Sequence, residues 1–490
     1  MINLLGMKPF FYLTLILLIQ SKIYHACNND ISQIHVSYGP NPSSSMTISF
    51  AVPYPCSSTG YFTTKNNKDA AVVVDVAYRK KKPPNNKDDN AWMWVTEDDH
   101  WINQYNSTSA AAEEEEDVQY YISPYFHHFS LEGLDASTEY EYVCVVLSVE
   151  KGVEEQSEIR RRLRVQEAEL GRKVNVFRTA PVEGSNTESY KVGVIADFGM
   201  TERSVKNYES ILSQKFDVHL IVGDISYANS NHTIWDDWFV WMEEIAQSSP
   251  VMPSPGNHER ETDIETGSIF DAYENRFACP QISEAIRIPQ NPEESSTYVG
   301  TYDYGNSFYS FSAGLGLFIF LNPYTSAEEG SPQYNFLKET LESVDRNISP
   351  WIFVSMHCPF YNTFDRHVDE AQTIEMKSSL EPLLVEYQVN IVFSGHTHGY
   401  SRSYPVAFDE VDQEGMSPIY INIGDGGRKS EAELYQSMIP ESWVEVRDGF
   451  SVSHGSIEFL NSTHILWTRF LAMEGDVYEE ITIRNQYEFL

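Results

Sequence analysis

The chain has 490 residues, of which 41% are hydrophobic and 13% aromatic. This is enough apolar material for two or three domains with true cores, and it excludes a wholly disordered chain. The 71 acidic residues outnumber the 34 basic ones and give a net charge of −37. Such a charge repels nucleic acid and anionic membranes, so we expect neither as a stable partner. A small anionic substrate stays compatible, because bound di- or trivalent cations reverse the field locally.

Residues 1–26 have the pattern of a signal peptide. Lys8 supplies a positive charge, and the apolar run Pro9–Ile19 is too short to span a bilayer, which disfavours the rival reading of a signal anchor. We expect cleavage near Ala26 and no stable membrane association afterwards. Four N-glycosylation sequons fit a chain that is secreted or delivered to a lysosome- or vacuole-like compartment, and they begin at Asn106, Asn231, Asn347 and Asn461.

Two of the cysteines form a preferred disulfide pair. Cys56 and Cys144 both fall in strand-like segments of the first domain, and we expect them to pair. The count of five is odd, so one thiol stays unpaired within the chain or forms an intermolecular bond. A homodimer is one oligomeric state that the sequence allows. No CxxC spacing occurs, which argues against zinc-ribbon and thioredoxin-like functions. The other cysteines are Cys27, Cys279 and Cys358.

Residues 27–180 are predicted to form an all-β domain, because β-forming residues cluster in short runs bounded by Pro and Gly. The stretch from His128 to Tyr142 resembles the corner of a fibronectin type III sandwich, in which a Tyr hydroxyl caps backbone groups. Two polar or charged inserts, Lys80–Asn90 and Ser107–Asp117, are predicted to be solvated loops. The predicted strands are Ile31–Tyr38, Ser45–Val52, Tyr120–Phe129, Tyr140–Val149 and Val174–Arg178.

Residues 181–189 are polar and contain Gly, and we predict a linker there. From 190 to 490 short apolar strands alternate with helical patterns, which indicates an α/β layered domain. Strands return in the C-terminal region 415–480. Ser331 is predicted to cap a helix that has Pro332 in its first turn. The predicted strands are Lys191–Ala196, Val218–Val222, Leu315–Leu321, Trp351–Met356 and Val389–Phe393, and further helices are predicted at Arg203–Gln214, Trp235–Gln247 and Thr373–Tyr387.

Five short segments of this second domain carry metal-ligating side chains, each after an apolar run. Carboxylate, imidazole and amide oxygen suit Zn, Mn and Fe(II), and a phenolate adds preference for a harder ion such as Fe(III). No segment is decisive alone, since an Asp or Asn after a strand is usually a turn residue. Jointly they predict two metal ions held close together. The segments are Ala196–Gly199, Gly223–Tyr227, Gly256–Glu259, Met356–His357 and Gly395–His398.

The position of the ligands adds to the argument. Asp197, Asp224, His357 and His396 each come just after a predicted strand, and in open α/β sheets ligands gather at the carboxyl ends of strands. Asp224 is the candidate for a carboxylate that bridges both ions. A metal pair about 3.5–4 Å apart grips both the attacking and leaving oxygens of a phosphoryl transfer, and it lowers the pKa of a bound water toward about 7. The pattern therefore predicts hydrolysis of a phosphate ester.

The chain resembles the purple acid phosphatases of the large, plant-like, two-domain type, within the metallophosphoesterase superfamily. The resemblance covers nearly the whole chain: the β domain, the five metal segments and the motif Pro418–Gly427. Tyr227, three residues after Asp224, separates this family from relatives that carry another residue there. The implied fold is an N-terminal all-β fibronectin type III-like sandwich, followed by an α/β four-layer (αββα), calcineurin-like metallophosphoesterase domain.

The resemblance implies two metal sites that share one carboxylate. Charge transfer from the Tyr227 phenolate to Fe(III) would colour the protein. The second ion would be divalent, namely Zn, Mn or Fe(II). The implied ferric ligands are Asp197, Asp224, Tyr227 and His398, and the implied divalent ligands are Asp224, Asn257, His357 and His396.

The resemblance also implies roles for two further histidines. His258 would contact the phosphate, and His367 would act near the leaving group. The residue before His367 is often also His in the family but is Arg366 here, and a guanidinium binds phosphate oxygens but is a poor proton donor. The family's Glu after the Tyr of the His-x-His motif is missing from Tyr400-Ser401-Arg402. The implied reaction is attack of a metal-bound hydroxide on a phosphate monoester, without a covalent phospho-enzyme.

Three functions stay open. The first is an exported acid phosphatase (EC 3.1.3.2) that acts on small phosphomonoesters. The second is a phosphodiesterase or nucleotide pyrophosphatase on the same metals, since the sequence does not reveal the pocket. The third is a catalytically weak binding or adhesion protein, although the filled ligand positions argue against it. Ser/Thr protein phosphatases share part of the pattern, but the signal peptide and Tyr227 disfavour them. We expect structural roles for His127, His128, His219, His454 and His464.

Overall fold

The computed structural model describes residues 31–52, 70–81, 93–95, 99–110, 118–150, 174–186, 189–280, 302–428, 433–472 and 477–487. The predicted signal peptide, Cys27 and Cys56 lie outside these residues, so the signal and the Cys56–Cys144 pairing stay predictions. Within the described residues, no helix has the length and apolar character needed to cross a membrane.

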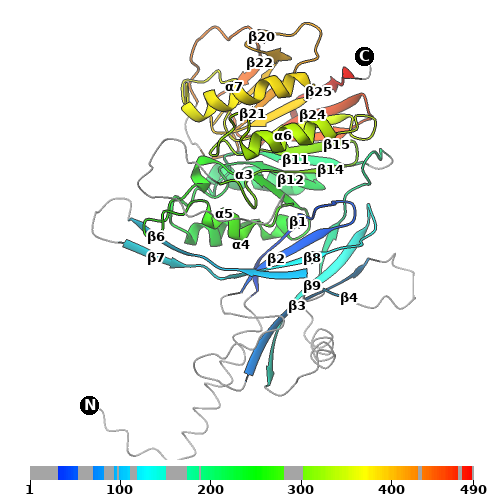
Figure 1. The fold of residues 1–490 in the computed structure, drawn as a ribbon, viewed down its shortest axis with the longest axis vertical. Coiled ribbons are helices and arrows are strands. Elements are labelled where there is room, and N and C mark those ends of the chain that lie inside the picture. Colours follow the sequence, from blue (N-terminus) through cyan, green and yellow to red (C-terminus); the bar gives the residue numbers. More distant parts are fainter. Residues whose placement is uncertain are drawn as a thin grey trace, which may run out of the picture.

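The N-terminal part consists of strands in two four-stranded sheets and one separate hairpin (Figure 1). The sheet orders are β1-β2-β8-β5 and β10-β9-β3-β4, and β6 pairs with β7. The prediction of strands in this part is confirmed for the described residues. The strands are β1 (Ser32–Tyr38), β2 (Met46–Val52), β3 (Ala70–Lys80), β4 (Met93–Trp94), β5 (His100–Asn103), β6 (Asn106–Ala110), β7 (Val118–Ile122), β8 (Tyr125–Leu131), β9 (Glu139–Glu150) and β10 (Asn175–Arg178).

The predicted contact of a Tyr hydroxyl with the backbone is present at Tyr140. Its hydroxyl accepts a hydrogen bond from the backbone N–H of Asp135 at 2.8 Å. This contact caps the turn between β8 and β9, as a tyrosine corner does. The likeness of the whole N-terminal part to a fibronectin type III sandwich stays a prediction.

Two predictions in this part are wrong. The predicted strand Tyr120–Phe129 is two strands, β7 and β8. The strand structure is interrupted between them at Pro124, which has no N–H to donate to a sheet. The predicted loop Ser107–Asp117 begins as part of β6, and Ser107 to Ser109 are buried. Their hydroxyls suggest a solvent-exposed loop, but β6 contacts Ser230 and Asp263 of the C-terminal part.

Residues 190–487 contain two larger mixed sheets, of six and seven strands. The rings of Phe353 and Phe393 in one sheet lie 5.9 and 5.5 Å from those of Phe459 and Trp467 in the other, so the sheets face each other. The first sheet has the order β13 (Val251–Ser254), β12 (Val218–Val222), β11 (Lys191–Ile195), β23 (Ser453–Phe459), β24 (His464–Leu471), β25 (Val477–Arg484). The second has the order β14 (Tyr309–Ala313), β15 (Gly316–Phe320), β16 (Trp351–Ser355), β17 (Ile391–Ser394), β21 (Ile419–Ile423), β18 (Tyr400–Ser403), β22 (Val444–Asp448).

Helices pack on both sheets, and the predicted alternation of strands and helices is confirmed. Ile211 of α3 and Met242 of α4 join the core around the first sheet, and Leu337 of α6 and Leu380 of α7 join the core of the second. Ser331 caps α6 as predicted, by accepting from Tyr334 N. The four-layer order itself stays a prediction. The helices are α3 (Glu202–Gln214), α4 (Thr233–Ala246), α5 (Asp271–Arg276), α6 (Pro332–Ser343), α7 (Ala371–Glu386, with Pro382 inside) and the short 3₁₀ helix η2 (Asn257–Glu259).

A buried arginine joins the two parts of the chain. Arg276, at the end of α5, is fully buried and donates to Gln33 Oε1 at 2.9 Å and to Tyr121 OH at 2.7 Å, both from the N-terminal part. It also donates to Tyr105 OH and pairs with Asp236 of α4 at 2.9 Å. A buried guanidinium must find acceptors for its N–H groups, and Arg276 finds them only with both parts in place.

His128 lies in the same interface. Its Nδ1 accepts from Ser49 Oγ at 2.8 Å and its Nε2 donates to the Asn275 carbonyl at 3.2 Å, an arrangement that suits the neutral ring. Burial, and after it the neighbouring His35, lower the pKa of His128 to about 3. Because this folded-state pKa lies below the unfolded value of about 6.5, its contribution to stability is present above pH 6.5 and is lost as the pH falls.

We therefore expect the interface to weaken in acid. Between pH 6.5 and 4, the free energy of unfolding of the wild type should fall more steeply than that of His128→Gln, by up to about 1.4 kcal/mol per pH unit. Denaturant titration at several pH values measures this difference. Parallel pH dependences for the two proteins would contradict the assignment.

Candidate metal centre

The ends of four strands deliver predicted ligands to one place. Asp197 follows β11, Asp224 follows β12, His357 follows β16 and His396 follows β17. Asp197, Asp224 and His396 have φ values of 52°, 52° and 67°. Non-glycine residues keep such left-handed backbone only where the surrounding structure enforces it, and such strain clusters at functional sites.

Two glycines let the chain come this close. A Cβ on Gly223, which has φ of 79°, would lie 2.3 Å from His357 Nδ1. A Cβ on Gly256 would lie 2.2 Å from Asp224 Oδ1. Any larger residue at either position would displace a candidate ligand.

One cluster forms around Asp197. Its Oδ1 accepts from Tyr227 OH at 2.8 Å and lies 3.2 Å from His398 Nε2. Tyr227 OH is also 3.1 Å from the same His398 nitrogen. Asp197 Oδ2 accepts from the backbone N–H of His396 at 2.8 Å, which fixes the carboxylate. The phenol, imidazole and carboxylate predicted for the ferric site thus converge.

A second cluster forms around Asp224. His357 Nδ1 donates to the Val222 carbonyl at 2.9 Å, and its Nε2 faces Asp224 Oδ1 at 3.3 Å. His396 completes this cluster, and one ligand atom from each of Asp224, His357 and His396 lies within 4.8 Å of the others. The same limit holds for the set Asp197, Asp224 and His398. Asp224 therefore belongs to both sets, as a bridging carboxylate must.

These residues fit a pair of cations. His357 Nε2 is buried and has no hydrogen-bond partner among the described residues, and such an orphaned nitrogen is costly unless something binds it. Asp197 and Asp224 are at most 1% exposed, although they are charged groups of the same sign in one cluster. Buried charges need partners of opposite charge or metal ions. The donor set of carboxylate, imidazole, amide and phenol supplies the ligands that such ions take.

The pKa shifts reflect the same crowding of negative charge. Burial raises the pKa of Tyr227 well above its usual value, and Asp197 and Asp224 raise it further. Burial lowers the pKa of His357, but the two carboxylates outweigh burial and bring it to about 10. Cations in place of protons would reverse both directions, since a bound ion is the largest local charge in a site.

The remaining predicted site residues lie beside these clusters. Asn257 begins η2, and its Oδ1 lies 3.4 Å from Tyr324 OH. The backbone N–H of His258 donates to Asp224 Oδ1 at 3.0 Å, and its Nε2 is 3.7 Å from Asp224 Oδ2. The ring of His367 lies 3.7 Å from that of His396. The structure thus brings all the predicted ligands and both predicted catalytic histidines to one region.

Glu259 is a site residue that sequence reasoning missed. Its carboxylate accepts from three backbone N–H groups, those of Asp224 at 2.7 Å, Ile225 at 2.9 Å and Gly256 at 2.8 Å. Burial first, and Asp224 next, raise the pKa of Glu259 to about 8. These bonds hold the strained backbone of Asp224. In the sequence, only its position directly after His258 indicated that Glu259 lies near the site.

Glu370 was also missed. Its Oε2 lies 2.8 Å from His396 Nε2, and its Oε1 lies 2.7 Å from His367 Nδ1. Burial raises its pKa, but hydrogen bonds from His367 and His396 outweigh burial and leave the pKa well below the usual value. One carboxylate therefore orients a candidate ligand and a candidate catalytic histidine together. Its spacing of three residues from His367 was the only signal.

Tyr400 and Arg402 share a carboxylate from a distant strand. Glu479 of β25 accepts from Arg402 Nε at 2.9 Å and from Tyr400 OH at 2.5 Å.

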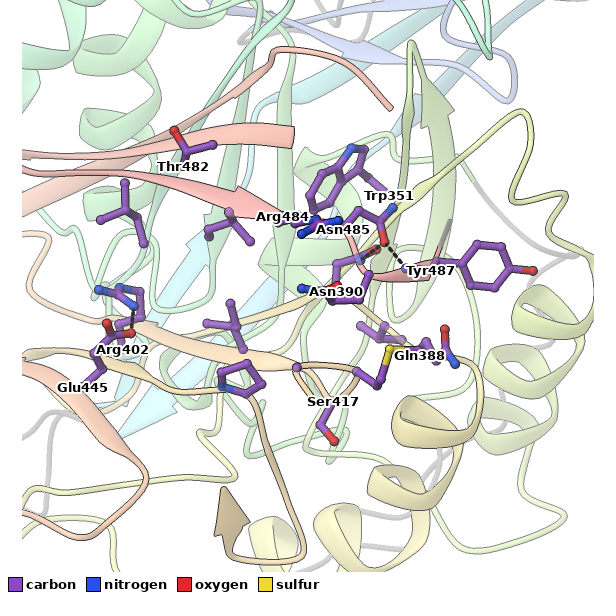
Figure 2. A pocket seen from close by; sticks show the side chains of 18 residues that line it. Trp351, Gln388, Asn390, Arg402, Ser417, Glu445, Thr482, Arg484, Asn485 and Tyr487 are labelled. Carbon is purple, nitrogen blue, oxygen red and sulfur yellow. Dashed lines mark hydrogen bonds and ion pairs between the residues drawn. The ribbon is translucent and has the colours of Figure 1, made fainter. Parts of the chain in front are cut away.

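A cavity of about 380 Å³ lies away from the metal centre (Figure 2). Trp351 and Ile419 line it where β16 and β21 begin, which is the opposite end of the sheet from the ligands. Its Arg402 is paired with Glu445, and Asn390 bonds to Asn485 at 3.1 Å (Figure 2). This cavity has no part in the site described above.

Known proteins are similar to this chain in sequence. Residues 190–400 match the family described as calcineurin-like phosphoesterase, and residues 417–480 match the iron/zinc purple acid phosphatase-like protein C family. Purple acid phosphatase 15 of Arabidopsis thaliana is 30% identical over 423 residues, covering 75% of this chain and 72% of that protein. Probable purple acid phosphatase 20 of the same plant is 35% identical, over 59% of this chain and 63% of that protein.

A solved structure agrees. The purple acid phosphatase PPD1 from seeds of yellow lupin (Lupinus luteus) has a TM-score of 0.69 and 19% identity, with 94% of this chain and 76% of that chain covered. At this identity the match speaks for the fold alone.

Fold and site together define a metallophosphoesterase. Within that class, the chain belongs to the purple acid phosphatase family. The family resemblance found in the sequence is confirmed.

The Glu259 contacts generate a prediction. Glu259→Ala leaves three buried N–H groups without acceptors, and each costs about 1–3 kcal/mol. We expect a loss of about 3 kcal/mol or more in the free energy of unfolding. Glu259→Gln retains one acceptor oxygen and should lose less. Denaturant unfolding measures both, and equal losses would show that the acceptors do not matter.

Proposed function

We propose that this protein is an exported acid phosphatase that hydrolyses small phosphate monoesters with a dinuclear metal centre. The observation that carries the proposal is Asp224, a buried carboxylate shared by two sets of metal-ligating side chains. The family shown by the comparisons supports the reaction class. One relative, from Allium cepa, is 29% identical over 75% of this chain and is named as a phosphatase of phosphoenolpyruvate.

The proposed metals are Fe(III) beside a divalent ion, namely Zn, Mn or Fe(II). When bound, they would supply a water of lowered pKa and positive charge against the phosphoryl oxygens. The buried phenol of Tyr227 supports a hard trivalent ion in the first site. The first site would be held by Asp197, Asp224, Tyr227 and His398, and the second by Asp224, Asn257, His357 and His396.

The remaining side chains have proposed roles around the substrate. His258, anchored through its backbone to Asp224, would hold the equatorial phosphate oxygens. When its ring is protonated, His367 donates Nδ1–H to Glu370, and its Nε2–H would protonate the leaving alkoxide. Arg366 is exposed on the same loop and would add a fixed positive charge.

Export is supported by the sequons. All four sequon asparagines lie exposed, so each is open to glycosylation: Asn106, Asn231, Asn347 and Asn461. We propose secretion or delivery to a lysosome- or vacuole-like compartment.

Two assays test the function. Purified protein should cleave p-nitrophenyl phosphate faster than the bis-ester at acidic pH, and contain about two metal ions per chain. Faster cleavage of the bis-ester would favour a phosphodiesterase or pyrophosphatase. Less than one bound ion and no turnover would favour a binding protein.

The colour of the protein tests the ferric assignment. We expect a visible absorption band that Tyr227→Phe abolishes, while the other six proposed ligands still bind metal. Tyr227→Phe keeps the ring and removes only the phenolate oxygen. A band that persists in the variant, or an active but colourless wild type, would contradict the Fe(III)–phenolate assignment.

Substitution of Glu370 should cause the selective loss of one metal. Side chains that orient a metal-bound imidazole typically change metal affinity by about 10- to 100-fold when removed. Glu370→Ala should weaken binding of the divalent ion to that extent and leave iron in place, as measured by metal analysis after dialysis. Equal retention of both metals would show that Glu370 does not support His396.

A further inference from the structure

We propose that the N-terminal part of the chain helps to position His258 for catalysis. In this inference, which rests on the proposed function, the hairpin β6–β7 braces the turn 229–232, and Asn229 of that turn holds the His258 ring. Asn229 is thus a positioning residue that acts through His258, and the hairpin supports it from another domain.

The hairpin reaches the second domain directly. In Figure 1, β6 and β7 extend from the N-terminal sheets toward α5. Thr108 N donates to Asp263 Oδ2 at 2.6 Å, and Ile264 N donates to the Thr108 carbonyl at 3.0 Å. Ser109 Oγ donates to the Ser230 carbonyl at 3.1 Å. These side chains of β6 are buried, so the contacts are shielded from water.

The turn that the hairpin touches is strained. Asn229 and Ser230 are consecutive non-glycine residues with φ values of 51° and 68°. Such backbone persists only when its surroundings over-determine it. Ser230 is held on one side by Ser109 and on the other by its N–H bond to Glu261 Oε1 at 2.9 Å. Glu261 is itself held by Trp235 Nε1 at 2.8 Å.

Asn229 links this turn to the site. Its Oδ1 accepts a short hydrogen bond from His258 Nδ1. With Nδ1–H committed to Asn229, the other nitrogen, Nε2, faces the metal centre at 3.7 Å from Asp224 Oδ2. The His258 ring also packs against the Tyr227 ring, with centroids 4.3 Å apart. Asn229 therefore fixes the direction in which the His258 ring points.

The path from the hairpin to His258 is short. Ser109 holds Ser230, whose neighbour Asn229 holds His258. A shift of the turn would move the Asn229 oxygen, and misplacement of a catalytic group by about 1 Å can cost about 100-fold in rate. The hairpin thus has a catalytic consequence beyond holding the two parts together.

The test uses the full-length, metal-loaded protein and p-nitrophenyl phosphate. We expect Asn229→Ala to lower kcat by about 10- to 100-fold while metal content and visible absorption stay at wild-type levels. Asn229→Asp keeps an acceptor oxygen at the same place and should restore most of the rate. Loss of kcat below twofold in Asn229→Ala, or no rescue by Asp, would overturn the role of Asn229.

A matched pair of serines tests the hairpin. Ser37 Oγ donates to the Ala278 carbonyl at 2.6 Å, so it also joins the N-terminal part to the second domain by one buried hydroxyl, far from the turn in sequence. Ser109→Ala should lower kcat by about 2- to 10-fold, the range that one hydrogen bond commands. Ser37→Ala should lower thermal stability similarly and leave kcat unchanged.

The outcomes separate the alternatives. Equal kcat for Ser109→Ala and Ser37→Ala would reduce the hairpin to a purely structural contact and overturn its catalytic role. A wild type with no phosphatase activity would defeat the proposed function. An active wild type with an indifferent Asn229→Ala would defeat only this inference.

Discussion

The constraint on which the site depends is the burial of two carboxylates, Asp197 and Asp224, in one cluster with almost no exposure to solvent. Two like charges in a medium of low polarity repel each other strongly, and neither has an Arg or Lys partner among the ion pairs of the described residues. The histidines around them supply positive charge only when protonated. Cations shared through Asp224 would satisfy every group at once.

The fold holds this arrangement at a conformational cost. The chain adopts left-handed backbone at Asp197, Asp224 and His396, and two glycines leave room for the carboxylate and imidazole beside them. The three N–H bonds of Glu259 keep the Asp224 loop in place. Strain at the site is thus balanced by ordinary hydrogen bonds just behind it, as expected where function requires unusual geometry.

Much of this could be predicted from the sequence, for a physical reason. Apolar runs mark strands, and the residue after a strand is at the sheet edge, so the placing of Asp197, Asp224, His357 and His396 followed from local patterns. Asn229, Glu370 and Glu479 could not be predicted in this way. Their roles depend on which distant segments the tertiary fold brings together, and a lone polar residue in a loop carries no such information.

The same limit explains one error in the N-terminal part, the loop predicted at Ser107–Asp117. Ser107 to Ser109 look like a solvated loop, because their burial depends on contacts with residues far along the chain, which local composition does not reveal. The interface around Arg276 was likewise invisible, since a single Arg near the end of a short helix has no distinctive spacing. Contacts between segments far apart in the sequence can be predicted only when the tertiary fold is known. The residues at the ends of neighbouring strands can be predicted from the order of the strands alone.

The most direct test is anomalous diffraction from crystals of the purified protein, recorded above and below the iron absorption edge. The account predicts an iron peak beside Asp197 and Tyr227, and a second ion beside His357 and His396, with Asp224 touching both. A single ion that Asp224 does not touch, or no peak in this cluster, would contradict it.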